Sequence, residues 1–290
     1  MEFVKYNAPL SGEIKGVDLN NFLSIETKKN IKKFVDDNLV ALIRNQNIND
    51  HKLKDFSKLF GELDPPAPNP YGVSFLPEHP EINVISNVKD TKGTPIGNLG
   101  DGEATWHADM TYLEEPPKYG ILYALEVPQN EGNTHFANMY KAYERLPTKL
   151  KEKIEDKIII HDSSHNSAGM LRKGYKEVKS PDQTPGARHP AIITNPKNNT
   201  KRLFLGRRPH AYILGMSISE SEKLLDEIWH FATLDEITWT QNWKVGDLLI
   251  WKNLYVLHKR DAFNPNSRRI MHRTQIKGDN NLNWFNFFYF

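Results

Sequence analysis

The 290-residue chain contains no cysteine. This absence excludes disulfide frameworks, thiolate zinc sites and cysteine nucleophiles together. No apolar run reaches the length of a membrane span, and the opening stretch MEFVKYNAPLSGEIKGVDL carries charges throughout and does not resemble a signal peptide. We therefore expect a cytoplasmic protein. No glycine-rich phosphate loop follows a predicted strand, so the nucleotide-binding folds are poorly supported.

The chain also lacks an excess of charge of either sign. Lys and Arg total 38 against 36 for Asp and Glu, which leaves a formal net charge of +2. This balance does not provide the basic stripe with which proteins bind nucleic acids or anionic membranes. We expect neither nucleic acid nor membrane as a partner, and we expect any functional Lys or Arg to act within a local site.

The pattern of apolar stretches and turns predicts a mostly β protein with some helices. Residues 1–62 are expected to mix helices at 24–38 and 51–61 with a buried strand at 39–46, and to buttress the core without forming a separate domain. Helices are also predicted at 139–156, interrupted at Pro147, and at 217–233, with Ser219 and Glu222 at a capping-box spacing. Further strands are predicted at 82–87, 118–128, 202–208 and 268–278, and 237–259 is predicted to form a strand, a turn and a strand. This order suits a β-sandwich or jelly roll better than alternating βαβ units.

The run TWHADMTY at 105–112 carries the pair His107 and Asp109. In a β-strand, residues two apart project to the same face, so the imidazole and the carboxylate would lie side by side. Two histidines and one carboxylate on one face of an octahedron form a non-haem iron site whose opposite face stays open. His258 is the candidate for the third ligand. For the pair alone, the alternative is an ordinary surface strand.

His258 ends the predicted strand LLIWKNLYVLH, and the next strand places Arg269 and Arg273 on one face. If these two strands pair, both arginines point toward the space that His258 faces. A guanidinium is a planar, permanently charged fork suited to a carboxylate or sulfonate. A solvated strand face is the alternative for the arginines. Six other histidines compete for the ligand role, namely His161, His165, His189, His210, His230 and His272.

Four motifs in order resemble the Fe(II)/2-oxoglutarate-dependent dioxygenases of the taurine dioxygenase and 2,4-dichlorophenoxyacetate dioxygenase family. They are TWHADMTY, EGNTHFANM at 131–139, GDLLIWKNLYVLH at 246–258 and SRRIMHRT at 267–274. The resemblance extends from GEIKGVDL near the start to about Gly278. It implies one domain over 1–290, in which 82–278 form a double-stranded β-helix (a cupin-like jelly roll) with an inserted excursion at 163–200 over the mouth of the site.

The resemblance also implies roles for individual residues. His107, Asp109 and His258 would hold Fe(II), and Thr134 and Arg269 would bind 2-oxoglutarate. Arg273 matches the position that meets the acidic group of the substrate. Such an enzyme consumes O₂ and 2-oxoglutarate, releases succinate and CO₂, and hydroxylates a substrate C–H bond. Related halogenases lack the carboxylate ligand, which this chain keeps as Asp109.

Two departures from the taurine dioxygenases concern the substrate. The loop ELDPPAPNP at 62–70 contains no histidine where those enzymes have one, and Glu103 stands where they have asparagine. We expect a small substrate that bears a carboxylate, sulfonate or phosphonate. Glu103 facing Arg273 would suit a zwitterionic acid, and the alternative is that Glu103 points to solvent. Arg207, Arg208 and His210 would line either the pocket or a subunit contact.

A different class of function stays open at this point, a cupin-like binding or sensing protein that keeps a metal without turnover. Thr134 and Arg269 discriminate between the two, since a metal-binding barrel needs no 2-oxoglutarate cradle. A zinc hydrolase is less well supported because no general base accompanies the ligands in a zinc-protease spacing. The terminal WFNFFYF at 284–290 is expected in the core or in an intersubunit patch, and we expect a homo-oligomer, either a dimer or a tetramer.

Overall fold

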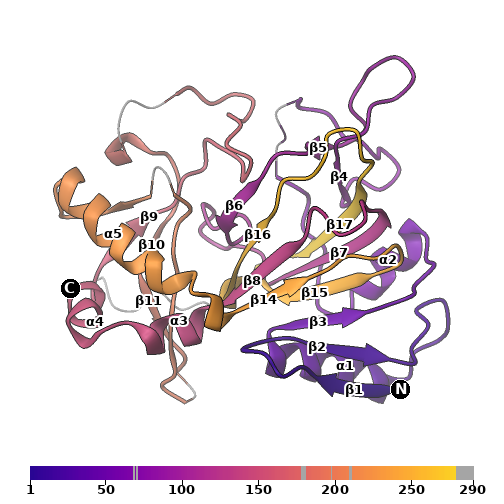
Figure 1. Ribbon diagram of the computed structural model, residues 1–290, viewed down its shortest axis with the longest axis horizontal. Coiled ribbons are helices and arrows are strands. Elements are labelled where there is room, and N and C mark those ends of the chain that lie inside the picture. The colour runs from indigo at the N-terminus through magenta and orange to yellow at the C-terminus, as the bar shows by residue number, and fades with distance from the viewer. Residues whose placement is uncertain (68, 70, 178–180, 197, 209–210, 279–290) are drawn as a thin grey trace.

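Two β-sheets packed face to face form the centre of the molecule (Figure 1). The computed structural model describes residues 1–67, 69, 71–177, 181–196, 198–208 and 211–278. The larger sheet has eight strands, in the order β1 (Glu2–Lys5), β2 (Gly12–Lys15), β3 (Val40–Ile43), β15 (Leu248–Lys252), β7 (Tyr119–Glu126), β17 (Ile270–Ile276), β4 (Asn83–Ser86) and β5 (Asn98–Leu99). The smaller sheet has four, in the order β14 (Thr238–Gln241), β8 (Thr134–Asn138), β16 (Val256–Arg260) and β6 (Ala104–His107). The expected mostly β fold is confirmed.

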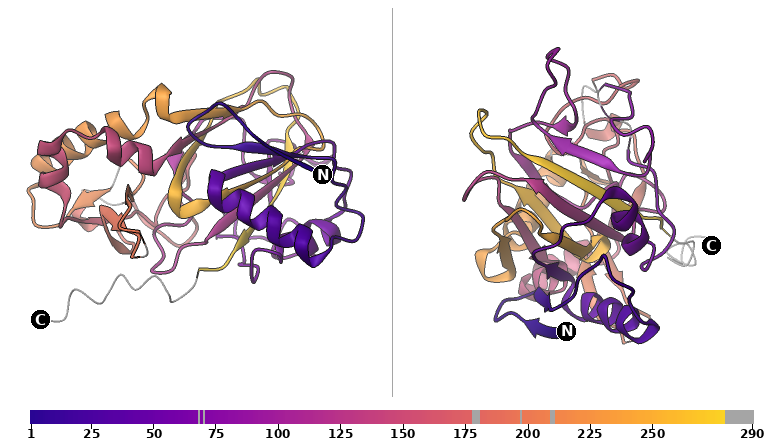
Figure 2. Two further views of the ribbon diagram at one scale, coloured as in Figure 1. Left: turned by 90° about the horizontal axis from the view of Figure 1, so that it is seen from below. Right: turned by 90° about the vertical axis from the view of Figure 1, so that its right-hand side faces the viewer.

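The period-two alternation of strand β15 explains how the layers are filled. Leu249 and Trp251 point into the core between the two sheets, while Leu248 and Ile250 point to the opposite face. That opposite face is covered by helices α1 (Ile25–Asn38) and α2 (Asp50–Ser57), as Figure 2 shows. Residues 1–62 therefore supply both the covering helices and three strands of the same sheet. This sharing favours the single-domain interpretation, which stays a prediction.

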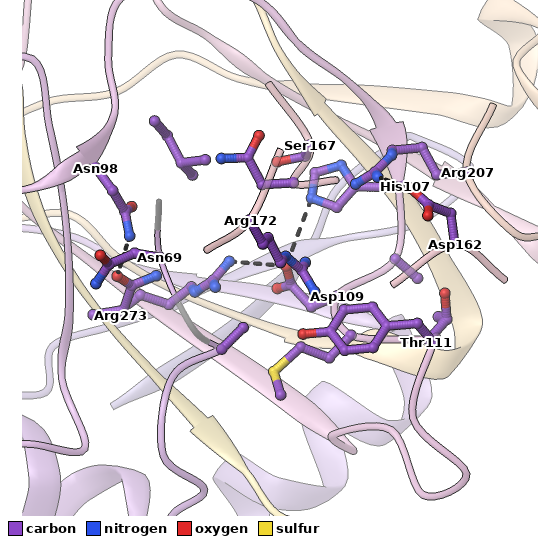
Figure 3. A pocket seen from close by; sticks show the side chains of 17 residues that line it. Asn69, Asn98, His107, Asp109, Thr111, Asp162, Ser167, Arg172, Arg207 and Arg273 are labelled. Carbon is purple, nitrogen blue, oxygen red and sulfur yellow. Dashed lines mark hydrogen bonds and ion pairs between the residues drawn. The ribbon is translucent and has the colours of Figure 1, made fainter. Parts of the chain in front are cut away.

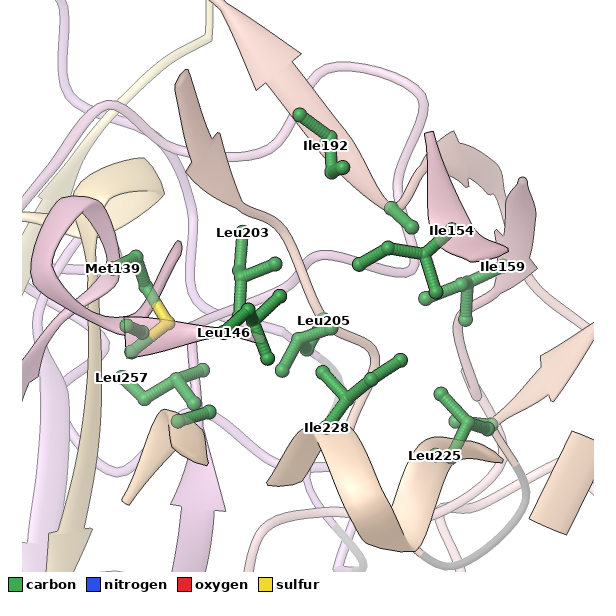
Figure 4. Packing of buried hydrophobic residues seen from close by; sticks show 14 of the residues in the cluster. Met139, Leu146, Ile154, Ile159, Ile192, Leu203, Leu205, Leu225, Ile228 and Leu257 are labelled. Atoms are coloured by element: carbon green, nitrogen blue, oxygen red, sulfur yellow. The ribbon is translucent and has the colours of Figure 1, made fainter. Parts of the chain in front are cut away.

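The outer face of the four-stranded sheet packs against a second apolar core (Figure 4). It lies under α3 (Met139–Arg145), α4 (Thr148–Ile154) and α5 (Ile218–Ala232) and includes two small sheets. One small sheet joins β9 (Ile158–Ile160), β10 (Arg188–Pro190) and β13 (Tyr212–Ile213), and the other pairs β11 (Ile192–Thr194) with β12 (Lys201–Leu203). The excursion at 163–200 thus contains short strands that its polar composition does not predict.

The predicted capping box of helix α5 is displaced by two residues. The Ser217 side chain accepts from the Glu220 backbone and the Glu220 side chain accepts from the Ser217 backbone. The predicted partner, Glu222, pairs instead with Arg208, at 2.8 Å between Nη1 and Oε1. For helix α1, in contrast, the Ser24 cap agrees with the sequence pattern, since its side chain accepts from the Thr27 backbone.

The stretch 237–259, predicted as a strand, a turn and a strand, contains one strand more than predicted. The stretch forms β14, β15 and β16, and a 3₁₀ turn at Asn253–Tyr255 carries the chain from the larger sheet to the smaller one. Consequently β16 pairs with β6 and β8, while β17 pairs with β4 and β7. The strands that hold His258 and Arg273 therefore do not pair, and the two residues meet across the sandwich.

Two sequence predictions lie outside the described residues, namely the pocket role of His210 and the apolar patch at 284–290. No helix among the described residues combines the length and the apolarity needed to cross a bilayer.

Candidate metal centre

Three buried side chains converge where the strands β6 and β16 lie side by side. His107 ends β6 and is directly opposite His258 in the register of the two strands. The distance from Asp109 Oδ1 to His107 Nε2 is 3.6 Å, and from Asp109 Oδ2 to His258 Nε2 it is 3.9 Å. One ligand atom from each residue lies within 4.8 Å of the others. This is the spacing that a single metal ion bound by all three requires.

Asp109 is not positioned in the way that the strand pattern predicts. Strand β6 ends at His107, and Met110 adopts a left-handed conformation with φ of 51°. The buried side-chain amide of Asn253 fixes the turn at Asp109 instead. Asn253 Oδ1 accepts from Asp109 N at 2.7 Å, and Asn253 Nδ2 donates to Asp109 O at 2.8 Å. The expected strand over 105–112 is therefore wrong beyond His107, and Asn253 is a positioning residue that the sequence pattern did not reveal.

The hydrogen bonds around the cluster leave the metal-facing atoms available. Arg273 Nη1 donates to Asp109 Oδ1 at 2.8 Å, while Asp109 Oδ2 is buried and has no hydrogen-bond partner among the described residues. The Nδ1 atom of His107 lies 2.7 Å from the Thr105 carbonyl oxygen, which places the proton on Nδ1 and leaves the Nε2 lone pair free. The donor set fits a divalent metal of the two-histidine, one-carboxylate type.

Electrostatics keep His258 and Asp109 in the protonation states that bind metals. Burial, and secondarily the neighbouring His107, lowers the pKa of His258 to about 3, so its imidazole is neutral. Burial alone would raise the pKa of Asp109, but the Arg273 guanidinium and the two histidines hold that pKa well below its usual value. Neutral imidazoles and an ionised carboxylate are the forms in which these side chains act as ligands.

A first pocket adjoins the histidines and contains Thr134, Arg260 and Arg269. Arg269 is 2% exposed, and its Nε and Nη1 groups have no hydrogen-bond partner among the described residues. Burial, with the charge of Arg260, lowers the pKa of Arg269 well below its ordinary value. Thr134 Oγ1 accepts from Trp243 Nε1 at 2.9 Å, so its hydroxyl proton is free to donate into the pocket. These groups present positive charge and hydrogen-bond donors to one small space.

Arg260 is a member of this first pocket that sequence reasoning missed. It is 6% exposed, and its Nη2 donates to the carbonyl oxygens of Leu99 and Gly102, while its Nε has no partner among the described residues. Burial lowers its pKa to about 10. A signal was available, because Arg260 follows His258 by two residues on one strand and therefore shares its face.

A second pocket lies on the other side of Asp109 (Figure 3). Arg273 lines both pockets, and Arg207 lines the second one, where its Nη2 lies 3.0 Å from Asp162 Oδ2. Arg208 lines neither pocket, since its side chain is turned to Glu222 and Asp226 of helix α5. Glu103 is exposed and lines neither pocket, so its substrate role stays a prediction without structural support.

Comparison with known proteins decides the family. Residues 5–275 match the family model described as "Taurine catabolism dioxygenase TauD, TfdA family". The chain belongs to this family. The fold agrees with solved TauD/TfdA structures: a crystal structure of AAD-2 in complex with Mn(II) and N-oxalylglycine matches with a TM-score of 0.76 at 25% identity, covering 96% of this chain and 97% of that one. A taurine dioxygenase from Burkholderia xenovorans matches with a TM-score of 0.75 at 25% identity, covering 96% and 89%.

Curated relatives of the TauD/TfdA chain are named for different substrates. It is 31% identical to the (S)-phenoxypropionate/alpha-ketoglutarate-dioxygenase of Sphingobium herbicidovorans over 71% of this chain and 75% of the relative. It is 26% identical to the alkylsulfatase of Acinetobacter baylyi over 96% of this chain and 86% of the relative. The predicted family, jelly-roll fold and dioxygenase class, with their metal and 2-oxoglutarate, are confirmed at the level of the family. The non-catalytic alternative is not favoured, and the substrate is not decided.

Proposed function

We propose that this TauD/TfdA dioxygenase uses Fe(II), 2-oxoglutarate and O₂ to hydroxylate a small molecule that bears a carboxylate, sulfonate or phosphonate. The observation that carries the proposal is the buried cluster of His107, Asp109 and His258 beside Arg269, whose Nε and Nη1 have no partner in the described part of the chain. When bound, ferrous iron would activate O₂, the oxidant, while 2-oxoglutarate and the substrate C–H bond would each give two electrons, with release of succinate and CO₂. The protein supplies binding, orientation and exclusion of water.

The three ligands divide their atoms between the metal and the protein. We assign Nε2 of both histidines and Oδ2 of Asp109 to the metal. Arg273 holds Oδ1 of Asp109, and Asn253 holds the Asp109 backbone, so that this residue is fixed at its side chain and at its main chain. Support of this kind by groups behind the ligands commonly changes metal affinity about 10- to 100-fold.

The first pocket is assigned to 2-oxoglutarate. Arg269 is buried with two N–H groups that have no partner among the described residues, a costly arrangement unless an anion accepts from them. The distal carboxylate of 2-oxoglutarate would supply both acceptors and the neutralising charge, and the Thr134 hydroxyl would donate to it as well. His107 and His258 line the same pocket, so the other end of the co-substrate would reach the metal.

The test is release of succinate from 2-oxoglutarate by the Fe(II)-loaded protein, across carboxylates, sulfonates and phosphonates. We expect at least one small acid to stimulate release, and Asp109→Ala to abolish it. His135→Asn is a matched control, because His135 pairs with Asp261 at 2.6 Å on the same sheet but outside both pockets. If the wild-type protein bound neither Fe(II) nor 2-oxoglutarate, the proposal would be wrong. Cytoplasmic location and homo-oligomeric assembly stay predictions.

A further inference from the structure

The second pocket, beside Asp109, is small and is lined by both polar and apolar side chains. Its volume is about 60 Å³, whereas one water molecule needs roughly 10–15 Å³. Polar side chains contribute much of its lining, including Asn83, Asn98, Asn166, Ser167 and Thr111. A long alkyl chain or a substituted aromatic ring would exceed this volume, and the space suits a molecule of few atoms that can accept hydrogen bonds.

Three guanidinium groups reach this pocket, and two of them are already paired with carboxylates (Figure 3). Arg273 donates to Asp109 at 2.8 Å. Arg207 donates to Asp162 at 3.0 Å and to the His165 carbonyl oxygen at 2.8 Å. Both cations therefore already face a carboxylate, although Arg273 Nε, like Arg172 Nε, has no hydrogen-bond partner among the described residues.

Arg172 differs from both. It is 8% exposed, its Nε has no hydrogen-bond partner among the described residues, and Nη1 donates only to the carbonyl oxygen of Ser163, at 3.2 Å. The guanidinium carbon lies 4.1 Å from the centroid of the Tyr112 ring, which fixes its plane. No described carboxylate forms an ion pair with it. A buried cation without an acid is unfavourable unless a ligand brings one.

We infer that Arg172, packed on Tyr112, binds the acid group of the substrate, and that the substrate is a small hydrophilic anion. This inference rests on the proposed function and makes it more specific. It assigns the acid end of the substrate to the inserted excursion at 163–200. Arg273, which the sequence singled out for this role, lines the same pocket, and its contact with the substrate stays a prediction.

Binding without turnover tests the inference. The protein is loaded with Mn(II) and N-oxalylglycine, a pair seen together in a related structure, and is titrated by calorimetry with 2-hydroxyethanesulfonate and 2-aminoethylphosphonate. Hexyl sulfate and phenoxyacetate serve as apolar anions. We expect at least one hydrophilic anion to bind more tightly than either apolar one.

Variants of two arginines separate the roles. Arg172→Gln is expected to weaken the hydrophilic anion about 10- to 100-fold, as loss of a charge-assisted hydrogen bond implies, and Arg172→Lys to restore part of the affinity. N-oxalylglycine should bind Arg172→Gln as tightly as wild type, which shows that the variant is folded. Arg208→Gln, a matched control outside the pocket, should change neither affinity.

Three results would overturn the inference. They are undiminished anion binding by Arg172→Gln, tighter binding of the apolar anions, and no anion binding by the loaded wild-type protein. Failure of the proposed function is distinguishable from these, because it appears one step earlier as failure of Mn(II) and N-oxalylglycine to bind.

Discussion

Replacement of Arg269 by methionine should have opposite effects on the ligand-free and the ligand-bound protein. In the ligand-free protein, no acid group of the described residues pairs with the buried guanidinium, and both burial and Arg260 disfavour its charge. Methionine has a similar length and carries no charge. We therefore expect the free energy of unfolding without ligand to stay unchanged or to rise, by up to about 2 kcal/mol.

The same change should remove most of the binding of 2-oxoglutarate. Loss of one partner of a buried, hydrogen-bonded charge pair costs about 3 kcal/mol, which is about 150-fold in the dissociation constant. At 100 times the wild-type dissociation constant, ligand stabilises the wild-type protein by about 2.7 kcal/mol. At that concentration the variant, which binds about 150-fold more weakly, should gain only about 0.3 kcal/mol.

Urea unfolding of the Mn(II)-loaded protein, with and without 2-oxoglutarate, measures both effects. Arg268→Met is the matched control, because Arg268 is the neighbouring residue, is exposed and pairs with Glu126 at 2.7 Å. It should leave the 2-oxoglutarate-dependent stabilisation intact. If Arg269→Met lowered the stability of the ligand-free protein yet kept the full stabilisation by 2-oxoglutarate, the assigned role of Arg269 would be refuted.

Three further substitutions test other parts of the site and fold. Asn253→Ala should weaken Mn(II) binding about 10- to 100-fold in a calorimetric titration, because Asn253 holds the Asp109 backbone; unchanged affinity would contradict this role. Gly120→Ala should destabilise the protein by about 1–3 kcal/mol in urea, since a Cβ atom there would lie 2.2 Å from the Trp251 ring; a neutral effect would mean that the ring can move. Glu103→Gln should leave kcat/KM for every acid unchanged, because Glu103 is exposed outside both pockets; a change for zwitterionic acids alone would restore its predicted role.

The sequence predicted the residues of the metal site better than it predicted how the chain positions them. His107, Asp109 and His258 stand in motifs whose order resembles a family, and the fold brings them together. Strand periodicity did not account for Asp109, because a buried amide from Asn253 sets the turn that holds it. The crossing between sheets at Asn253–Tyr255 was also not predicted, since neither glycine nor proline marks the turn within LLIWKNLYVLH.

Other differences arise where a local pattern allows two answers. The capping-box spacing fits two pairs, Ser217 with Glu220 and Ser219 with Glu222. The first pair forms the box, because Glu222 pairs instead with Arg208, a residue outside the helix. Arg172 had no signal of its own, because it lies in a polar stretch without periodicity. Its burial depends on Tyr112, 60 positions earlier in the sequence, which only the folded chain brings near.

A crystal structure of the protein with Mn(II) and N-oxalylglycine tests the central claim most directly. We expect the metal to be bound by Nε2 of His107, Nε2 of His258 and Oδ2 of Asp109, with the distal carboxylate of N-oxalylglycine on Arg269. A metal bound elsewhere, or an inhibitor whose distal carboxylate does not contact Arg269, would contradict the assignment of this site.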